Sequence, residues 1–178
     1  MNELIDQKYY NFTSQFLSDN IINVYIDNTC TQVGHLTNLI SYVDSIVNFE
    51  FKIVDNAEDA EMRFYETNDI PGDYLGYAVP KYGISKVTTY SETVYKPYWN
   101  LLIRKDSNYE SLKAYVYTHE FGHALGFEHP YDNSDGDVWT TATTQDTVMT
   151  NKYLPKVNED WMFRQVEIDT ITGLYNKK

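Results

Sequence analysis

Cysteine is almost absent from this sequence, since Cys30 is the only one in 178 residues. One thiol cannot form a disulfide within the chain, and it cannot build a structural zinc site closed by several cysteines. A fold held together by internal disulfides is therefore excluded. We expect Cys30 to act as a small apolar residue of the interior.

Long apolar runs and a surplus of positive charge are also missing. No apolar stretch reaches the roughly eighteen residues that a membrane-spanning helix needs. The opening residues have neither a basic start nor an apolar stretch, so we expect no ordinary secretory signal. Lys and Arg total 14 against 26 Asp and Glu, a net charge of −12. This balance argues against nucleic acid and anionic membranes as partners.

Histidine is scarce but concentrated in the run His-Glu-x-x-His-x-x-Gly-x-x-His, from His119 to His129. Positions four apart share one face of a helix, so His119 and His123 can offer two imidazole nitrogens to one metal ion. Gly126 can adopt a positive φ, which would end the helix and bring His129 back to the same ion. Three imidazoles leave one position open, as in catalytic zinc sites. We predict a zinc site with these three ligands, rather than three ordinary histidines of the surface or core.

Glu120 lies one step along the same helix, about 100° around it from His119. This position should miss the metal and face the water bound to it. We therefore predict that Glu120 is a general base and not a ligand.

The extended motif, followed about twenty residues later by Met149, resembles the metzincin zinc metallopeptidases. Pro130, directly after the third histidine, is typical of the serralysins within that clan. The segments 146–150 and 167–175 are also similar to the serralysin catalytic domain. The clear resemblance covers about residues 109–176.

This resemblance implies an α+β fold with one catalytic domain over residues 1–178. Its upper subdomain, 1–129, would hold a twisted, mostly parallel five-stranded sheet and two long helices. A smaller lower subdomain, 130–178, would contain loops, the Met-turn and a terminal helix.

The resemblance also assigns roles below and beside the metal. Met149 would pack beneath the three histidines without binding the ion. Serralysins have a tyrosine two residues after that methionine, which can share the charge of the oxyanion, but here this position is Asn151. Tyr153 is the nearest candidate for that role, and Asn151 or neither residue are the alternatives.

A strand at 75–79 corresponds to the metzincin edge strand along which an extended substrate binds. Its candidate substrate-binding residues are Gly76, Tyr77, Ala78 and Val79. A plain edge strand without this role is the alternative.

Periodicity predicts further strands at 21–27, 49–53, 60–64 and 98–104, and helices from 32 to 47, 107 to 126 and 160 to 175. Thr31 is a candidate cap of the first helix, and Ser107 with Glu110 form a capping-box pattern for the second. Residues 1–20 should form a short helix or arm outside the core. The tyrosine-rich stretch 80–97 is either a functional loop or a hairpin.

Zinc is the cofactor we expect, and the oxygen-rich segment 131–137 is a weaker candidate for calcium against a plain acidic turn. The calcium-binding glycine-rich repeats that follow many serralysin domains are absent, so we expect either a cut-down catalytic domain, with a missing C-terminal region or propeptide as a candidate partner, or a single-domain member. The resemblance implies secretion, an extended protein or peptide substrate, and a proteinaceous inhibitor as a further candidate partner.

The predicted function is a zinc-dependent endopeptidase, in which Glu120 takes a proton from a metal-activated water that attacks the peptide carbonyl. One alternative is a catalytically inactive binding module on a metzincin fold. Another is a zinc enzyme that acts on bonds other than peptides.

Overall fold

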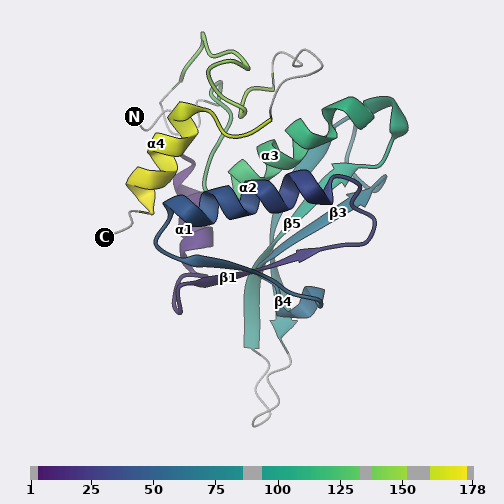
Figure 1. Cartoon of the computed structure of the whole chain (residues 1–178), viewed down its shortest axis with the longest axis vertical. Helices are drawn as coiled ribbons and strands as arrows, with labels where there is room; N and C mark the ends of the chain where they lie inside the picture. The colour runs from purple at the N-terminus through teal and green to yellow at the C-terminus, as the bar shows by residue number, and fades with distance from the viewer. Residues whose placement is uncertain (1–3, 86–93, 133–137, 152–160, 176–178) are drawn as a thin grey trace.

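A computed structural model describes residues 4–85, 94–132, 138–151 and 161–175 of the chain (Figure 1). One sheet contains all five strands in the order β2-β1-β3-β5-β4. Their bounds are β1 Ile21–Ile26, β2 Glu50–Ile53, β3 Met62–Thr67, β4 Gly76–Ser85 and β5 Val94–Arg104. Only β4 runs antiparallel to its neighbour, β5, and it forms one edge of the sheet. The predicted mostly parallel five-stranded sheet is confirmed.

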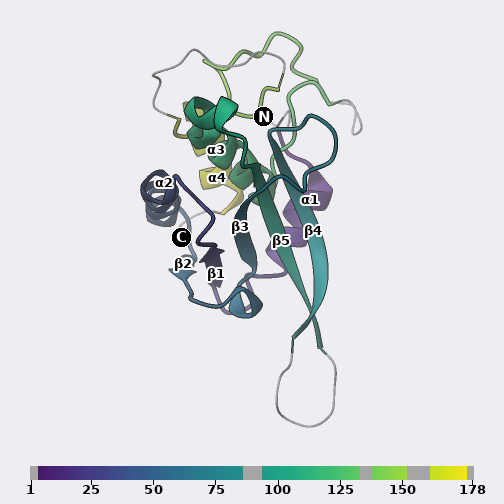
Figure 2. The same cartoon turned by 90° about the vertical axis from the view of Figure 1, so that its right-hand side faces the viewer.

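One face of the sheet carries the core. Alternate residues of β1 and β3 are fully buried, such as Val24 and its register partner Met62. Helices α2 (Val33–Ile46) and α3 (Lys113–Ala124) both cover this face (Figure 2). The sequence accounts for the packing of α2 on the sheet. Apolar residues recur at every second position of the strands and at every third or fourth position of α2, so each element has one apolar face.

The start of α2 differs from its predicted cap. Gln32 is the N-cap residue and makes no side-chain capping bond. The hydroxyl of Thr31 instead donates to Glu66 Oε1 on β3, at 2.6 Å. Thr31 as the helix cap was therefore wrong, because a buried carboxylate competes for its hydroxyl.

The start of the metal-site helix also differs. Residues Ser107–Leu112 form a 3-10 helix, η2, before α3 begins, and Asp106 caps it by accepting from the Asn108 N–H at 2.9 Å. Glu110 lies 2.7 Å from the amino group of Lys113. The predicted capping box was wrong, because Asp106 takes the capping role and Glu110 pairs with a lysine.

Helix α1 (Gln7–Ser14) belongs to the core and does not lie outside it. Phe12 and Phe16 are buried in the main hydrophobic cluster, and Phe12 packs edge-to-face on Trp99 of β5 at 5.2 Å. The hydroxyl of Thr13 donates to the carbonyl oxygen of Ala124 at the end of α3. The predicted short helix is confirmed, but its expected place outside the core was wrong, because the residues it packs against are distant in sequence.

The tyrosine-rich stretch contains a hairpin, one of its two predicted alternatives. Strands β4 and β5 continue into it on both sides, pairing as far as Ser85 and Val94, and extend beyond the other strands (Figures 1 and 2). The tip, 86–93, lies outside the described residues.

The remaining elements are a short 3-10 helix, η1 (Ala57–Asp59), and the C-terminal helix α4 (Gln165–Leu174). In the described part of the chain, no helix has the length and apolar character needed to cross a membrane. The division into subdomains at residue 129 stays a prediction.

Candidate metal centre

The three predicted ligands converge at the end of α3. His119 and His123 lie one turn apart on this helix, and Gly126 has φ +102° just after it. A side chain is rarely tolerated at such a φ, so glycine permits the turn that follows. His129 returns towards the helix, and the candidate ligand nitrogens of the three residues all lie within 4.8 Å of one another.

Backbone carbonyls orient two of the imidazoles. His119 Nδ1 lies 2.7 Å from the carbonyl oxygen of Val148, and His123 Nδ1 lies 2.8 Å from that of Phe127. An Nδ1–H that donates to a carbonyl leaves the lone pair on Nε2, the usual arrangement for a metal-binding histidine. His119 Nε2 lies 3.0 Å from His129 Nε2.

This arrangement fits a zinc ion. Zn–N bonds of about 2.0–2.1 Å in a tetrahedral site place ligand nitrogens roughly 3.3 Å apart, close to the separation of His119 and His129. Burial, followed by the neighbouring charge of His129, lowers the pKa of His119 to about 3. The pKa of His123 is also lowered, chiefly by burial. Neutral imidazoles at neutral pH are the form that binds metal.

Glu120 faces the same space from α3. Its side chain is buried, and its Oε2 has no hydrogen-bond partner among the described residues. Burial raises the pKa of Glu120 to about 8, although a hydrogen bond from the backbone of Ala78 opposes this shift. An unpaired buried carboxyl oxygen beside three imidazoles is costly in a purely structural role. It is suited to exchanging a proton with a ligand in the cleft.

Gly76 allows β4 to approach this carboxylate. A Cβ atom on Gly76 would lie 2.2 Å from Glu120 Oε1 and 2.6 Å from Val116 Cγ1. A side chain larger than hydrogen would require Glu120, Val116 or the edge strand to shift. The sequence marked Gly76 as a substrate-binding candidate, but its contact with Glu120 was not predicted.

The backbone of β4 also points into the cleft. Alternate residues of an antiparallel edge strand direct their N–H and C=O groups away from the sheet. The N–H of Ala78 points to Glu120 and not to β5. Gly76 lies two residues earlier on the same strand, so its N–H and C=O groups also point away from β5. The edge strand therefore presents backbone groups on the side of the candidate metal centre.

Met149 packs against the same helix from another side. A Cβ atom on Gly122 would lie 2.4 Å from Met149 Sδ, and Met149 is fully buried. The preceding residue, Val148, supplies the carbonyl that orients His119. Pro130 is buried, directly after the third histidine.

Helix α4 holds the Met149 segment in place through Glu167. This buried carboxylate accepts hydrogen bonds from the Val148 N–H at 2.9 Å and from the Thr147 hydroxyl. These bonds fix the Val148 carbonyl in the position where it accepts the hydrogen bond from His119 Nδ1. Glu167 lies in a segment that resembles serralysins, but its role as an anchor was not predicted.

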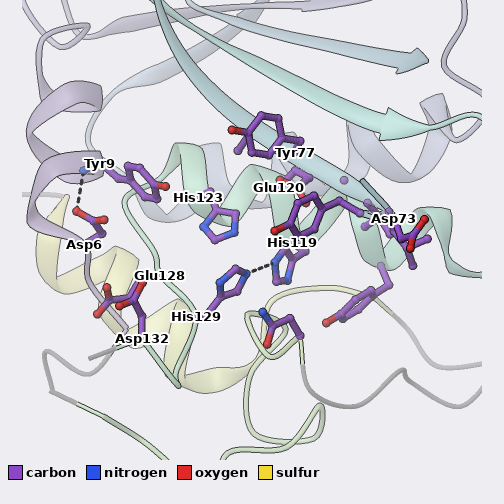
Figure 3. A pocket seen from close by; sticks show the side chains of 17 residues that line it. Asp6, Tyr9, Asp73, Tyr77, His119, Glu120, His123, Glu128, His129 and Asp132 are labelled. Atoms are coloured by element: carbon purple, nitrogen blue, oxygen red, sulfur yellow. Dashed lines mark hydrogen bonds between the residues drawn. The ribbon is translucent and has the colours of Figure 1, made fainter. Parts of the chain in front are cut away.

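A cleft of about 450 Å³ contains the candidate metal centre (Figure 3). Gly76, Tyr77, Ala78 and Asn151 line it as well as the three histidines and Glu120, whereas Val79 does not. The cleft also has a group of lining residues that the sequence did not indicate, namely Asp6, Tyr9, Asp73 and Tyr115, and it is lined by Asp132 of the calcium candidate. They come from separate elements, and no local motif connects them. Tyr153 and most of the calcium candidate, 133–137, lie outside the described residues.

Comparisons with known proteins add little to this picture. No protein-family model matches the chain, and no curated protein matches its sequence. Two solved structures of myroilysin are similar to it, each at 15% identity. One covers 89% of this chain and 93% of its own chain with a TM-score of 0.47. The other covers 88% and 83% with a TM-score of 0.48. The function is therefore inferred from the site itself.

Proposed function

We propose that this chain is a zinc-dependent endopeptidase of the metzincin type, with the serralysins as the subgroup that its motif resembles. The observation that carries the proposal is the convergence of His119, His123 and His129 beside the buried, unpaired Oε2 of Glu120. Three neutral imidazoles and a carboxyl group with one unpaired oxygen at one cleft supply a metal-binding set and a proton-accepting side chain.

The three histidines would hold the metal, which when bound supplies a Lewis acid that polarises a water molecule and the substrate carbonyl. Glu120 accepts a proton at Oε2, the oxygen that has no other partner in the described residues. Burial raises the pKa of Glu120 to about 8, so the protonated form is favoured when no cation is present. A nearby positive charge lowers such a pKa towards the working range of a base. Glu120 can then return the proton to the leaving amine.

We expect the substrate to be an extended peptide that binds along the edge strand β4. The outward backbone groups at Gly76 can pair with a further strand, as in other edge-strand complexes. The same edge carries Ala78, whose N–H holds Glu120 in position. Pairing with the substrate would therefore align the scissile bond with the base.

Hydrolysis of denatured casein, followed by mass spectrometry of the products, tests this proposal. Zinc-loaded protein should release internal peptides, and a chelator should stop the reaction until zinc is restored. Zinc binding without any cleavage would instead favour the inactive binding module. Turnover that a chelator leaves unchanged would refute the zinc-peptidase proposal.

A further inference from the structure

Helix α1 places an unused hydroxyl in the cleft, that of Tyr9. The hydroxyl of Tyr115, another lining residue, donates to the carbonyl oxygen of Thr150. The hydroxyl of Tyr9 makes no hydrogen bond to any residue that the structure describes. Buried tyrosine hydroxyls usually have a hydrogen-bond partner. Because the half-buried Tyr9 has none among the described residues, its hydroxyl is available to donate to water or to a ligand.

The Tyr9 ring lies directly beside a candidate metal ligand. It packs edge-to-face on His123 at 5.8 Å and on Trp99 at 5.3 Å. Figure 3 shows the hydroxyl end of Tyr9 turned towards His123. These ring contacts fix the direction of the Tyr9 hydroxyl, because Trp99 and His123 are themselves held by hydrogen bonds, to Thr13 and to the Phe127 carbonyl.

Hydrogen bonds at both ends of α1 tie it to the metal-site helix. The Asp6 N–H donates to the Gly126 carbonyl at 3.0 Å, before the first turn of α1. The Thr13 hydroxyl donates to the Ala124 carbonyl at 2.6 Å, near the last turn. Tyr9 lies between these two anchors, so its position relative to His123 is preset, as a ligand-contacting residue requires.

Tyr9 offers its hydroxyl to the cleft as a hydrogen-bond donor, because a tyrosine hydroxyl is protonated at neutral pH. The acceptors that every peptide offers are its carbonyl oxygens.

We propose that Tyr9 contacts the substrate, its hydroxyl donating a hydrogen bond to a carbonyl oxygen of a peptide bound on the His123 side of the cleft. This inference depends on the proposed function in taking a peptide as the ligand. It assigns to α1, an element far from the zinc motif in sequence, a direct part in substrate binding.

Tyr9→Phe tests the inference, because it removes the hydroxyl and keeps the ring on Trp99 and His123. Tyr10→Phe is the matched control, since Tyr10 packs on Tyr175 at 5.6 Å and does not line the cleft. The probe is the casein peptide that wild-type protein cleaves fastest, or the one it binds most tightly if none is cleaved. Affinity for the fluorescein-labelled peptide is measured by anisotropy in a Glu120→Gln background, and kcat/KM in the active one.

We expect Tyr9→Phe to weaken peptide binding and kcat/KM by roughly three- to tenfold, the size of one lost hydrogen bond. Zinc content and thermal midpoint should match those of Tyr10→Phe, which should bind and cleave like wild type. Unchanged affinity and turnover in Tyr9→Phe would overturn the inference, and so would a loss explained by lost zinc or stability. If wild-type protein binds but does not cleave peptides, the peptidase proposal fails while the affinity comparison still decides the role of Tyr9. If it does neither, both fail.

Discussion

Gly76 of the edge strand and Glu120 of the metal-site helix are in such close contact that a Cβ atom at residue 76 would lie 2.2 Å from Glu120 Oε1. The strand expected to bind substrate and the residue expected to act as base are therefore mechanically coupled. A shift of either element changes the position of the other, because packed interiors transmit displacements of this size.

We expect Gly76→Ala to lower kcat/KM by about tenfold or more, because the added methyl group must displace Glu120 or the strand. Steady-state peptide hydrolysis measures the change, with zinc content as a check on the histidines. Gly173→Ala is the matched control, since Gly173 lies on the exposed side of α4 and a Cβ there meets no atom within 4 Å. It should keep full activity and gain about 0.5–1 kcal/mol of stability. Full activity of Gly76→Ala would contradict the coupling.

Glu120→Gln should retain one zinc and the wild-type fold but lose about 10²- to 10⁴-fold in kcat, the usual contribution of a general base. Glutamine keeps the shape of the side chain and the acceptor for the Ala78 N–H, and removes the proton-accepting oxygen. Glu58→Gln, a charge change on the exposed η1, is the control. Residual turnover within tenfold of wild type would exclude Glu120 as the base.

A buried ion pair behind the metal-site helix should set part of the acid stability. Lys113 Nζ lies 2.8 Å from Glu66 Oε2, and both side chains are almost completely buried. Burial alone would raise the pKa of Glu66, but the hydrogen bond from Lys113 and those from Thr31 lower it overall. Because the pKa of Glu66 is lower in the folded protein than its value of 4.5 in the unfolded chain, ionised Glu66 stabilises the folded state above pH 4.5. This stabilisation is lost as the pH falls through the pKa of Glu66 in the folded protein.

Lys113→Met should therefore destabilise the protein by about 3–5 kcal/mol at pH 7, since it leaves Glu66 buried without its cation. Urea unfolding between pH 7 and 3 measures this loss and should show less acid sensitivity in the variant. Lys96→Met is the control, because Lys96 is 49% exposed and lies 3.5 Å from Glu61. It should cost no more than about 1 kcal/mol. Equal losses for the two variants would refute a special contribution from the buried pair.

The histidines give the metal-free protein a second pH dependence. The pKa of His119 is about 3 in the folded chain against 6.5 when unfolded, so the unfolded state binds more protons between these values. Stability is therefore complete above pH 6.5 and falls with pH below it, by up to about 1.4 kcal/mol per pH unit for this group. Urea unfolding of chelated protein at pH 7, 6 and 5 checks the slope. A His119→Gln variant should show a shallower slope, and an unchanged slope would contradict the assignment.

Local sequence pattern predicted the parts of this site that local geometry builds. The spacing of His119 and His123 on a helix and the positive φ of Gly126 both follow from residues close in sequence. The alternation in β1 and β3 likewise predicted the buried face of the sheet. Periodicity and turn chemistry act over a few residues, and they succeed where structure is decided at that range.

Two of the errors come from contacts between distant residues, whereas the capping box failed locally, through Asp106 and the pairing of Glu110 with Lys113. The arm at 1–20 joined the core because Thr13 bonds Ala124, a partner 111 positions away. Thr31 does not cap α2, because its hydroxyl donates to Glu66, which is 35 positions away. Tyr9 reached the cleft by the same docking of α1. No local signal in one sequence encodes such pairings, since tertiary contacts override propensity. Secretion and the roles of Tyr153 and of calcium stay predictions.

Metal analysis of the purified protein combined with X-ray absorption spectroscopy tests the central claim most directly. We predict one zinc per chain with three nitrogen ligands at about 2.0–2.1 Å and one further light atom. Substitution of His119, His123 or His129 by alanine should each abolish stoichiometric binding, whereas His35→Ala should leave it intact. A chain that binds no zinc, or that keeps its zinc after loss of any of the three histidines, would contradict the account.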